Sequence, residues 1–165
     1  MLLIAVIQGC KKNKHDESAS CNMFEVQAEN ATKIKVTDGV YGTVSFTEGD
    51  CMPVVHGGTD VSTCKTCPAK RTVKIYEYTT VDQATPRGRT TIFYDSFDTK
   101  LVKEVDTDNN GFFQTDLPAG QYTIVVVENG KLYANGWDGQ GGIKPFTHTS
   151  GAQNVSVDIN YKAAY

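Results

Sequence analysis

Short segments in which apolar and polar residues alternate run through the chain from residue 32 onward. Successive side chains of a β-strand point to opposite faces, so this alternation predicts strands with one buried face. In the first segment, for example, Val40, Val44 and Phe46 share one face. No stretch of ten or more residues after Thr32 shows the 3.6-residue periodicity of a helix. The predicted strands cover residues 40–46, 72–80, 90–94, 101–105, 122–127 and 155–161.

Turn signals between these segments support the same interpretation. Asn129-Gly130 separates two apolar segments and favours a two-residue hairpin, because both positions tolerate positive φ. The chain contains 15 glycines, eight tyrosines and seven phenylalanines, a balance that favours strands over helices. Its 165 residues suit one domain. Short strands separated by turns at this spacing predict an all-β sandwich in which most strands are antiparallel.

The first ten residues, MLLIAVIQGC, resemble the signal peptide and lipobox of a bacterial lipoprotein. The apolar run over 1–7 is too short to span a bilayer but matches the apolar region of a signal peptide. In a lipobox, a small residue precedes a cysteine that receives a diacylglycerol and becomes the new N-terminus. The resemblance implies a signal peptide over 1–9, lipidation of Cys10 and a flexible tether over 10–31. The alternative is a frayed apolar start with an unmodified Cys10.

The sequence DTDNNG at 106–111 raises the question of a calcium loop. It matches the first half of an EF-hand loop, but Leu117 occupies the twelfth position, where that loop needs a bidentate acid. The flanking segments are predicted strands rather than helices. We therefore expect a tight turn in which Asn110-Gly111 adopts positive φ and the Asp side chains accept hydrogen bonds from backbone amides. Phe113 and Leu117 are expected to point inward.

Three motifs together resemble the carboxypeptidase regulatory-like domain, whose pattern is G-x-V, then T-D-x-N-G-x-F, then L-P-x-G-x-Y-x-I/V. They are Gly42-Thr43-Val44, Thr107-Asp108-Asn109-Asn110-Gly111-Phe112-Phe113 and Leu117-Pro118-Ala119-Gly120-Gln121-Tyr122-Thr123-Ile124. The resemblance covers residues 40–130. It implies a prealbumin-like sandwich of about seven strands over 32–165, with motifs that are structural rather than catalytic. It also implies a passive or binding module of the kind found in surface lipoproteins of Gram-negative bacteria.

Four further cysteines give an exported domain the means to form disulfides: Cys21, Cys51, Cys64 and Cys67. Four cysteines allow three pairings. Cys51 paired with Cys64 or Cys67 closes a loop of roughly 15 residues, and Cys21 then ties the end of the tether to the sandwich. The alternatives are a zinc site formed by Cys51, His56, Cys64 and Cys67, and a redox C-x-x-C pair.

The only tryptophan, Trp137, lies in a glycine-rich loop together with Tyr133, Asn135 and Asp138. An exposed Trp beside amide and carboxylate groups can stack on a sugar ring and hydrogen-bond its hydroxyls, so these four residues are a candidate ligand site. The favoured alternative is that Trp137 plugs one end of the sandwich.

The charge pattern excludes one class of partner. The net charge is −3 and no basic stripe occurs, so the chain lacks the electrostatic footprint of a nucleic-acid-binding protein. His15 and His148 are isolated and are expected to be solvated, and no catalytic arrangement is evident. We therefore expect a non-enzymatic module without a cofactor, anchored by lipid in the cell envelope, at the outer membrane. Its partner would be a polysaccharide or another envelope protein. The alternatives are a structural or assembly subunit of the cell surface and a small metal-binding or redox protein.

Overall fold

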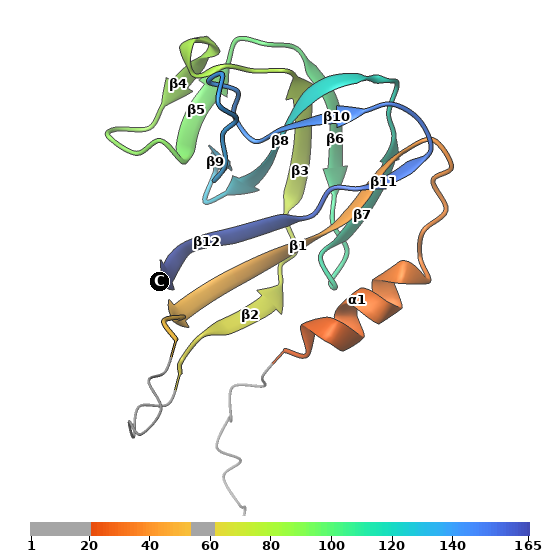
Figure 1. Cartoon of the computed structure of the whole chain (residues 1–165), viewed down its shortest axis with the longest axis vertical. Coiled ribbons are helices and arrows are strands. Elements are labelled where there is room, and N and C mark those ends of the chain that lie inside the picture. Colours follow the sequence, from red (N-terminus) through yellow and green to blue (C-terminus); the bar gives the residue numbers. More distant parts are fainter. Residues whose placement is uncertain (1–20, 54–61) are drawn as a thin grey trace, which may run out of the picture.

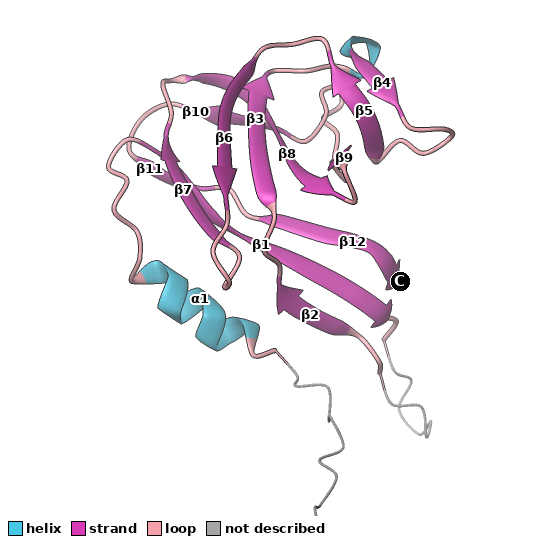
Figure 2. Ribbon diagram, turned by 180° about the vertical axis from the view of Figure 1, so that it is seen from behind, coloured by secondary structure: helices cyan, strands magenta, loops and turns pink. Residues whose placement is uncertain are grey.

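The computed structural model describes residues 21–53 and 62–165. Two β-sheets pack face to face, and one short helix lies beside the smaller sheet (Figures 1 and 2). The helix is α1 (Met23–Ala31), and a single 3-10 turn, η1, spans Val81–Gln83. The smaller sheet contains β1 (Gly39–Asp50), β2 (Lys65–Pro68), β7 (Phe112–Asp116), β11 (Ala152–Asn154) and β12 (Val157–Ala164). The larger sheet contains β3 (Thr72–Glu77), β4 (Ala84–Pro86), β5 (Phe93–Phe97), β6 (Leu101–Asp106), β8 (Gly120–Glu128), β9 (Lys131–Tyr133) and β10 (Pro145–His148).

Strand β1 is the central strand of the smaller sheet. It has 12 residues, which is long enough to pair with two short strands along each edge. One edge pairs in parallel with β11 and then with β12, and the other pairs antiparallel with β7 and then with β2. The side chains of one face of β1 therefore point toward the larger sheet, and those of the other face point outward, where α1 lies.

The larger sheet is antiparallel and has the order β4-β5-β9-β8-β3-β6, with β10 pairing along the first half of β8. Strand β8 is covered on both faces, so its run from Tyr122 to Val126 is buried throughout. The sequence predicted one buried face, formed by Tyr122, Ile124 and Val126. Thr123 and Val125 are also fully buried, because a second apolar cluster forms on the other side of the sheet.

The main core fills the space between the two sheets. It combines residues of β1 and β12, such as Val44 and Ile159, with residues of β3 and β8, such as Ile75 and Ile124. All four side chains are at most 1% exposed. The second cluster lies on the opposite face of the larger sheet and contains Tyr76, Tyr94, Val125, Leu132, Ala134 and Ile143.

The all-β sandwich of mostly antiparallel strands that the sequence predicts is confirmed, and every predicted strand overlaps an observed one. The number of strands in the described residues exceeds the expected seven, because the partners of β1 and β8 are divided into short segments. Strands β4, β9 and β11 have only three residues each. Such segments are too short to show alternation, and their pairing is set by the longer strand beside them.

The prediction of a flexible tether through residue 31 is wrong for its last part, where residues 23–31 form α1. Asn22 caps the helix, since its side-chain oxygen accepts hydrogen bonds from the amides of Phe24 (3.1 Å) and Glu25 (3.4 Å). The predicted signal peptide, Cys10 and His15 lie outside the described residues. Within the part of the chain that the structure describes, no helix is both long and apolar enough to cross a bilayer.

Candidate functional site

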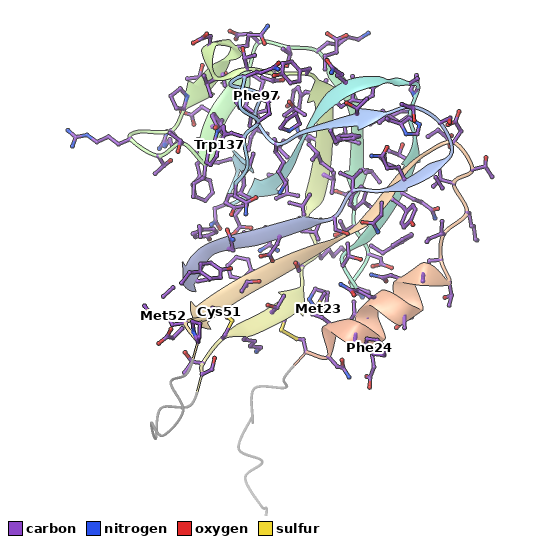
Figure 3. The ribbon with its side chains drawn as sticks, viewed as in Figure 1. Met23, Phe24, Cys51, Met52, Phe97 and Trp137 are labelled. Carbon is purple, nitrogen blue, oxygen red and sulfur yellow. A yellow bond between two sulfur atoms is a disulfide. The ribbon has the colours of Figure 1, made fainter. Side chains whose placement is uncertain are left out.

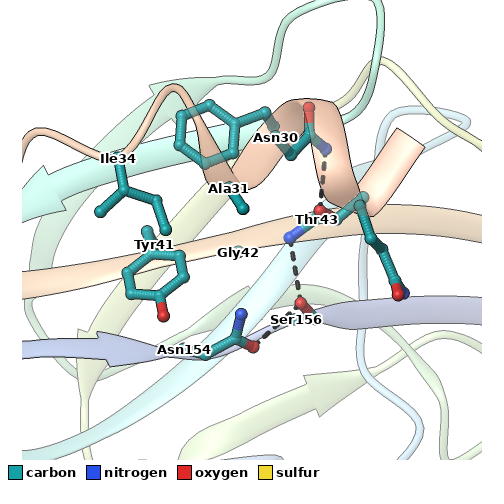
Figure 4. Close-up of a pocket in the computed structure, with 10 residues that line it drawn as sticks. Asn30, Ala31, Ile34, Tyr41, Gly42, Thr43, Asn154 and Ser156 are labelled. Atoms are coloured by element: carbon teal, nitrogen blue, oxygen red, sulfur yellow. Dashed lines mark hydrogen bonds between the residues drawn. The ribbon is translucent and has the colours of Figure 1, made fainter. Parts of the chain in front are cut away.

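A cavity of about 490 Å³ opens between α1 and the outward face of β1 (Figure 4). It exists because β1 alternates, so that Val40 and Val44 point into the core while Tyr41 and Thr43 face the helix. The polar side chains that line the cavity are Gln27, Asn30, Tyr41, Thr43, Asn154 and Ser156. Its apolar lining consists of Ala31, Ile34 and Phe112.

Asn30 fixes the C-terminal half of the helix over the sheet. It is the one residue of α1 that is fully buried, at 3% exposure. Its side-chain nitrogen donates to the hydroxyl of Thr43 (3.0 Å) and to the carbonyl of Asn110 (3.1 Å). A buried amide with all its hydrogen bonds made holds one geometry, because any movement leaves polar groups unpaired.

The chain after α1 is held by two further side chains. Lys33 donates to Asp108, with 2.9 Å between Nζ and Oδ2, and this hydrogen bond raises the pKa of Lys33. The side chain of Gln114 on β7 accepts from the amides of Lys35 (2.7 Å) and Val36 (2.9 Å). The segment after the helix, which contributes Ile34 to the cavity lining, is therefore attached to β7.

A disulfide between Cys21 and Cys67 holds the N-terminal end of α1 to β2, with 5.1 Å between the two α-carbons (Figure 3). The apolar residues of the helix contribute little to this attachment. Phe24, for example, is 80% exposed. A helix of nine residues is marginal on its own in water. Helix α1 forms the roof of the cavity and presents no continuous apolar face to the sheet. The disulfide at its N-terminal end and the hydrogen bonds of Asn30 at its C-terminal end therefore keep this roof in place.

Several polar groups that line the cavity are open to a ligand. Asn154 accepts a hydrogen bond from Ser156 (3.1 Å), and Ser156 in turn accepts from the amide of Thr43 (3.0 Å). Among the described residues, no hydrogen-bond partner is present for the side-chain nitrogen of Asn154, the side-chain amide of Gln27 or the hydroxyl of Tyr41. The cavity thus combines fixed groups with free donors and acceptors.

The remaining cysteines form a second disulfide, Cys51–Cys64, with an S–S distance of 2.02 Å. Both pairs agree with the predicted disulfides. The alternative of a zinc site is wrong, because Cys51, Cys64 and Cys67 are bonded to sulfur and supply no thiolate to a metal. Its fourth proposed ligand, His56, lies outside the described residues. The redox alternative is also wrong, since Cys64 and Cys67 bond to different partners rather than to each other.

The four residues of the predicted Trp137 site do not form one site. Trp137 is 45% exposed, so the prediction that it plugs one end of the sandwich is wrong (Figure 3). Tyr133 is fully buried in the main core, where its hydroxyl donates to Asn160 (3.0 Å). Asn135 donates to the carbonyl of Asp158 (3.0 Å) and so covers the free edge of β12.

Asp138 organises its own loop. One of its oxygens accepts hydrogen bonds from the amides of Gln140 (2.8 Å) and Gly142 (2.7 Å), and the other accepts from the hydroxyl of Tyr78 (2.8 Å). The bond from the Gly142 amide, followed by those from Tyr78 and Gln140, lowers the pKa of Asp138. Its hydrogen-bonding capacity is therefore directed to the protein, and Trp137 is left without polar neighbours aimed at a shared ligand.

The DTDNNG segment forms a tight turn between β6 and β7. One oxygen of Asp108 accepts from the amides of Asn110 (2.8 Å) and Phe112 (2.9 Å), as predicted. Gly111 has φ of 68°, while Asn110 does not adopt the positive φ that was expected. A β-carbon at Gly111 would overlap the carbonyl oxygen of Val44, so only glycine fits there. Phe113 and Leu117, expected inside, are each 2% exposed.

We expect chelation to leave thermal stability unchanged. The carboxylates of this turn are already engaged, since Asp108 holds backbone amides and Lys33, and Asp106 accepts from the hydroxyl of Thr72 (2.6 Å). Thermal unfolding with and without EDTA, followed by circular dichroism, measures the effect. A fall of many degrees on chelation that calcium reverses would contradict the interpretation as a turn.

Acid is expected to weaken the attachment of α1 through Asp108. Partial burial raises the pKa of this carboxyl, but hydrogen bonds from Lys33, Phe112 and Asn110 outweigh burial and bring it below the ordinary 3.8. The unfolded state then binds the proton more readily, so this contribution to stability is complete above the unfolded pKa and is lost as pH falls through the folded pKa. In urea unfolding at a series of pH values, the stability difference between wild type and Asp108→Asn should shrink below about pH 4. Parallel curves for the two proteins would show that Asp108 has no such role.

His148 is buried rather than solvated. Its ring nitrogens lie 3.3 Å from the side-chain oxygens of Gln153 and Asp38. The sequence offered no sign of this burial, because both partners come from other segments. The ring connects the end of β10 to the start of β1 and to β11, which is a structural role.

No protein family, curated protein or solved structure matches the chain. The resemblance to the carboxypeptidase regulatory-like domain stays a prediction from its motifs, and the cavity is the structural feature that bears on function.

Proposed function

We propose that this protein is a lipid-anchored binding module of the cell envelope and that its ligand occupies the cavity beneath α1. The observation that carries the proposal is the cavity itself, a site whose roof is held by a disulfide at one end and by Asn30 at the other. Sites that bind small molecules are concave, largely preformed and combine apolar walls with a few placed polar groups.

The lining supports binding rather than catalysis. Tyr41 is the only titratable group among the described residues that line the cavity, and no nucleophile lies beside a base there. General acid–base and nucleophilic catalysis both need such a pair within hydrogen-bond reach. A preformed cavity with amide and hydroxyl groups can recognise a molecule without transforming it.

The expected lipid anchor places this cavity near a membrane surface. Cys10 and Cys21 are separated by ten residues, Lys11 to Ser20. A fully extended chain of that length reaches no more than roughly 40 Å. Lipidation of Cys10 would thus keep α1 and the cavity within this distance of the bilayer, where envelope polymers are concentrated.

The anchor is tested with the full-length chain expressed in a Gram-negative host that is fed an alkyne-tagged fatty acid. We expect wild type to carry the tag and to sediment with membranes, and Cys10→Ala to lose both properties. The matched control is Cys51→Ala/Cys64→Ala, which removes a disulfide and leaves the lipobox intact. Labelling that persists in Cys10→Ala would contradict lipidation at this residue.

A structural subunit that assembles through an exposed edge strand is the second candidate. Strand β6 pairs with β3 alone among the described strands, so its other edge is available. However, β6 carries Lys103 and Glu104, and charged residues on an edge strand oppose pairing between copies. Sedimentation of Cys10→Ala over a range of concentrations separates the two functions, because only the assembly role predicts oligomers that grow with concentration.

A further inference from the structure

We infer that the cavity beneath α1 binds an uncharged, hydroxyl-rich ligand of the class of neutral oligosaccharides. The inference rests on the proposed function and narrows it to a class of ligand. The first observation is the absence of charge from the described lining, where no Asp, Glu, Lys, Arg or His occurs. Lys33, which follows α1, forms an ion pair with Asp108 at 2.9 Å, and neither residue lines the cavity. A charged ligand would lose hydration here without gaining a counter-charge.

The second observation is the kind of hydrogen-bonding group that stays open. The side-chain amide of Gln27 both donates and accepts hydrogen bonds, and so does the hydroxyl of Tyr41. The side-chain nitrogen of Asn154 donates. A sugar hydroxyl is also both donor and acceptor, so a ring with several hydroxyls can satisfy all three residues. A purely apolar ligand would bury these groups without partners, which costs free energy.

The third observation is the apolar part of the lining. Ile34 and the ring of Tyr41 lie side by side along one wall in Figure 4, and Phe112 contributes to the same cavity. The face of a pyranose ring that carries C–H groups packs against such surfaces, while its hydroxyls project from the rim. Walls of this mixed kind, in a cavity of about 490 Å³, suit a compact amphipathic ring.

The fixed groups make the site selective without a conformational change. Asn30, Thr43 and Ser156 are bonded to one another or to the backbone around the cavity, so their positions are set before a ligand arrives. A preformed site loses less conformational entropy on binding than a flexible one. The exposed Trp137 loop is also held by hydrogen bonds, but those bonds engage both carboxylate oxygens of Asp138 and leave them less open to a ligand.

Isothermal titration calorimetry of the full-length Cys10→Ala chain tests the inference. The neutral probes are malto-, cello-, manno- and galacto-oligosaccharides, and the acidic probes are oligogalacturonides. We expect at least one neutral probe to bind and the oligogalacturonides not to bind. In that background, Gln27→Ala and Asn154→Ala should each weaken binding about tenfold, because each removes one hydrogen bond. Trp137→Ala is the matched control and should bind as tightly as its parent, with unchanged circular dichroism in all variants.

The other outcomes separate the inference from the proposed function. The apolar probe is 1-octanol. Binding of oligogalacturonides or of 1-octanol that is weakened by Asn154→Ala would overturn the ligand class and leave the cavity as the binding site. Binding of a neutral probe that is abolished by Trp137→Ala and unaffected by Gln27→Ala and Asn154→Ala would overturn the location. If neutral, acidic and apolar probes all fail to bind, both the inference and the proposed function are contradicted.

Discussion

Replacing Cys21 and Cys67 together by alanine is expected to lower the free energy of unfolding by about 4 kcal/mol. The disulfide closes a loop whose ends are 46 residues apart, and the conformational entropy that a cross-link removes from the unfolded chain grows with loop length. The same variant should release α1, because the helix has few apolar contacts with the sheet. Urea unfolding measures the stability, and hydrogen exchange of the α1 amides measures the release.

The matched control is the double alanine variant of Cys51 and Cys64. Their separation is 13 residues, so the expected loss is smaller, about 3 kcal/mol. This variant should leave the exchange of the α1 amides and the binding of ligand unchanged, since the second disulfide does not touch the cavity lining. Equal exchange of α1 in the two variants would contradict the role assigned to Cys21–Cys67.

Phe113→Ala is expected to cost about 3–5 kcal/mol, because it leaves a cavity between the two sheets. Phe113 is 2% exposed and lies on β7 opposite Gly42 of β1. Its ring belongs to the main core, which both sheets share. The loss should appear as a lower urea midpoint with an unchanged slope, since the protein still unfolds as one unit.

Phe24→Ala is the matched control for this prediction. Phe24 lies on α1 with its ring 80% exposed, so its truncation should change the free energy of unfolding by no more than about 0.5 kcal/mol. Similar losses for Phe24→Ala and Phe113→Ala would show that the two sheets do not share the core described here.

The strands were predictable because their signals are local. Alternation marks β1 through Val40, Val44 and Phe46, and the turn at Asn129-Gly130 joins β8 to β9 with φ of 52° and 73° at the two positions, as expected for this hairpin. These patterns depend on the backbone of neighbouring residues. Partners far away in the sequence are not needed to recognise them.

Helix α1 was missed although it carries a local sign. Asn22 followed three residues later by Glu25 is typical of a helix N-terminus. The nine residues that follow have little apolar periodicity, since Met23 and Val26 are only partly buried and Phe24 is exposed. Tertiary contacts, above all the disulfide and Asn30, stabilise this helix, and no propensity argument includes them.

The cavity was not predictable from sequence for a related reason. Its lining joins Gln27 and Asn30 to Tyr41 and, more than 100 positions later, Asn154. Nothing in the pattern around any one of these residues indicates the others. The sequence instead drew attention to Trp137, whose neighbours in the chain are polar but point toward the protein.

The location of the binding site is tested most directly by chemical-shift mapping of the isotope-labelled, full-length Cys10→Ala chain with the neutral oligosaccharide that binds most tightly. We expect the shifts to gather on α1 around Gln27, on β1 around Tyr41 and at Asn154, while the backbone amides of the Trp137 loop stay unchanged. Shifts confined to the Trp137 loop, with α1 and β1 unaffected, would contradict the claim that the cavity beneath α1 is the binding site.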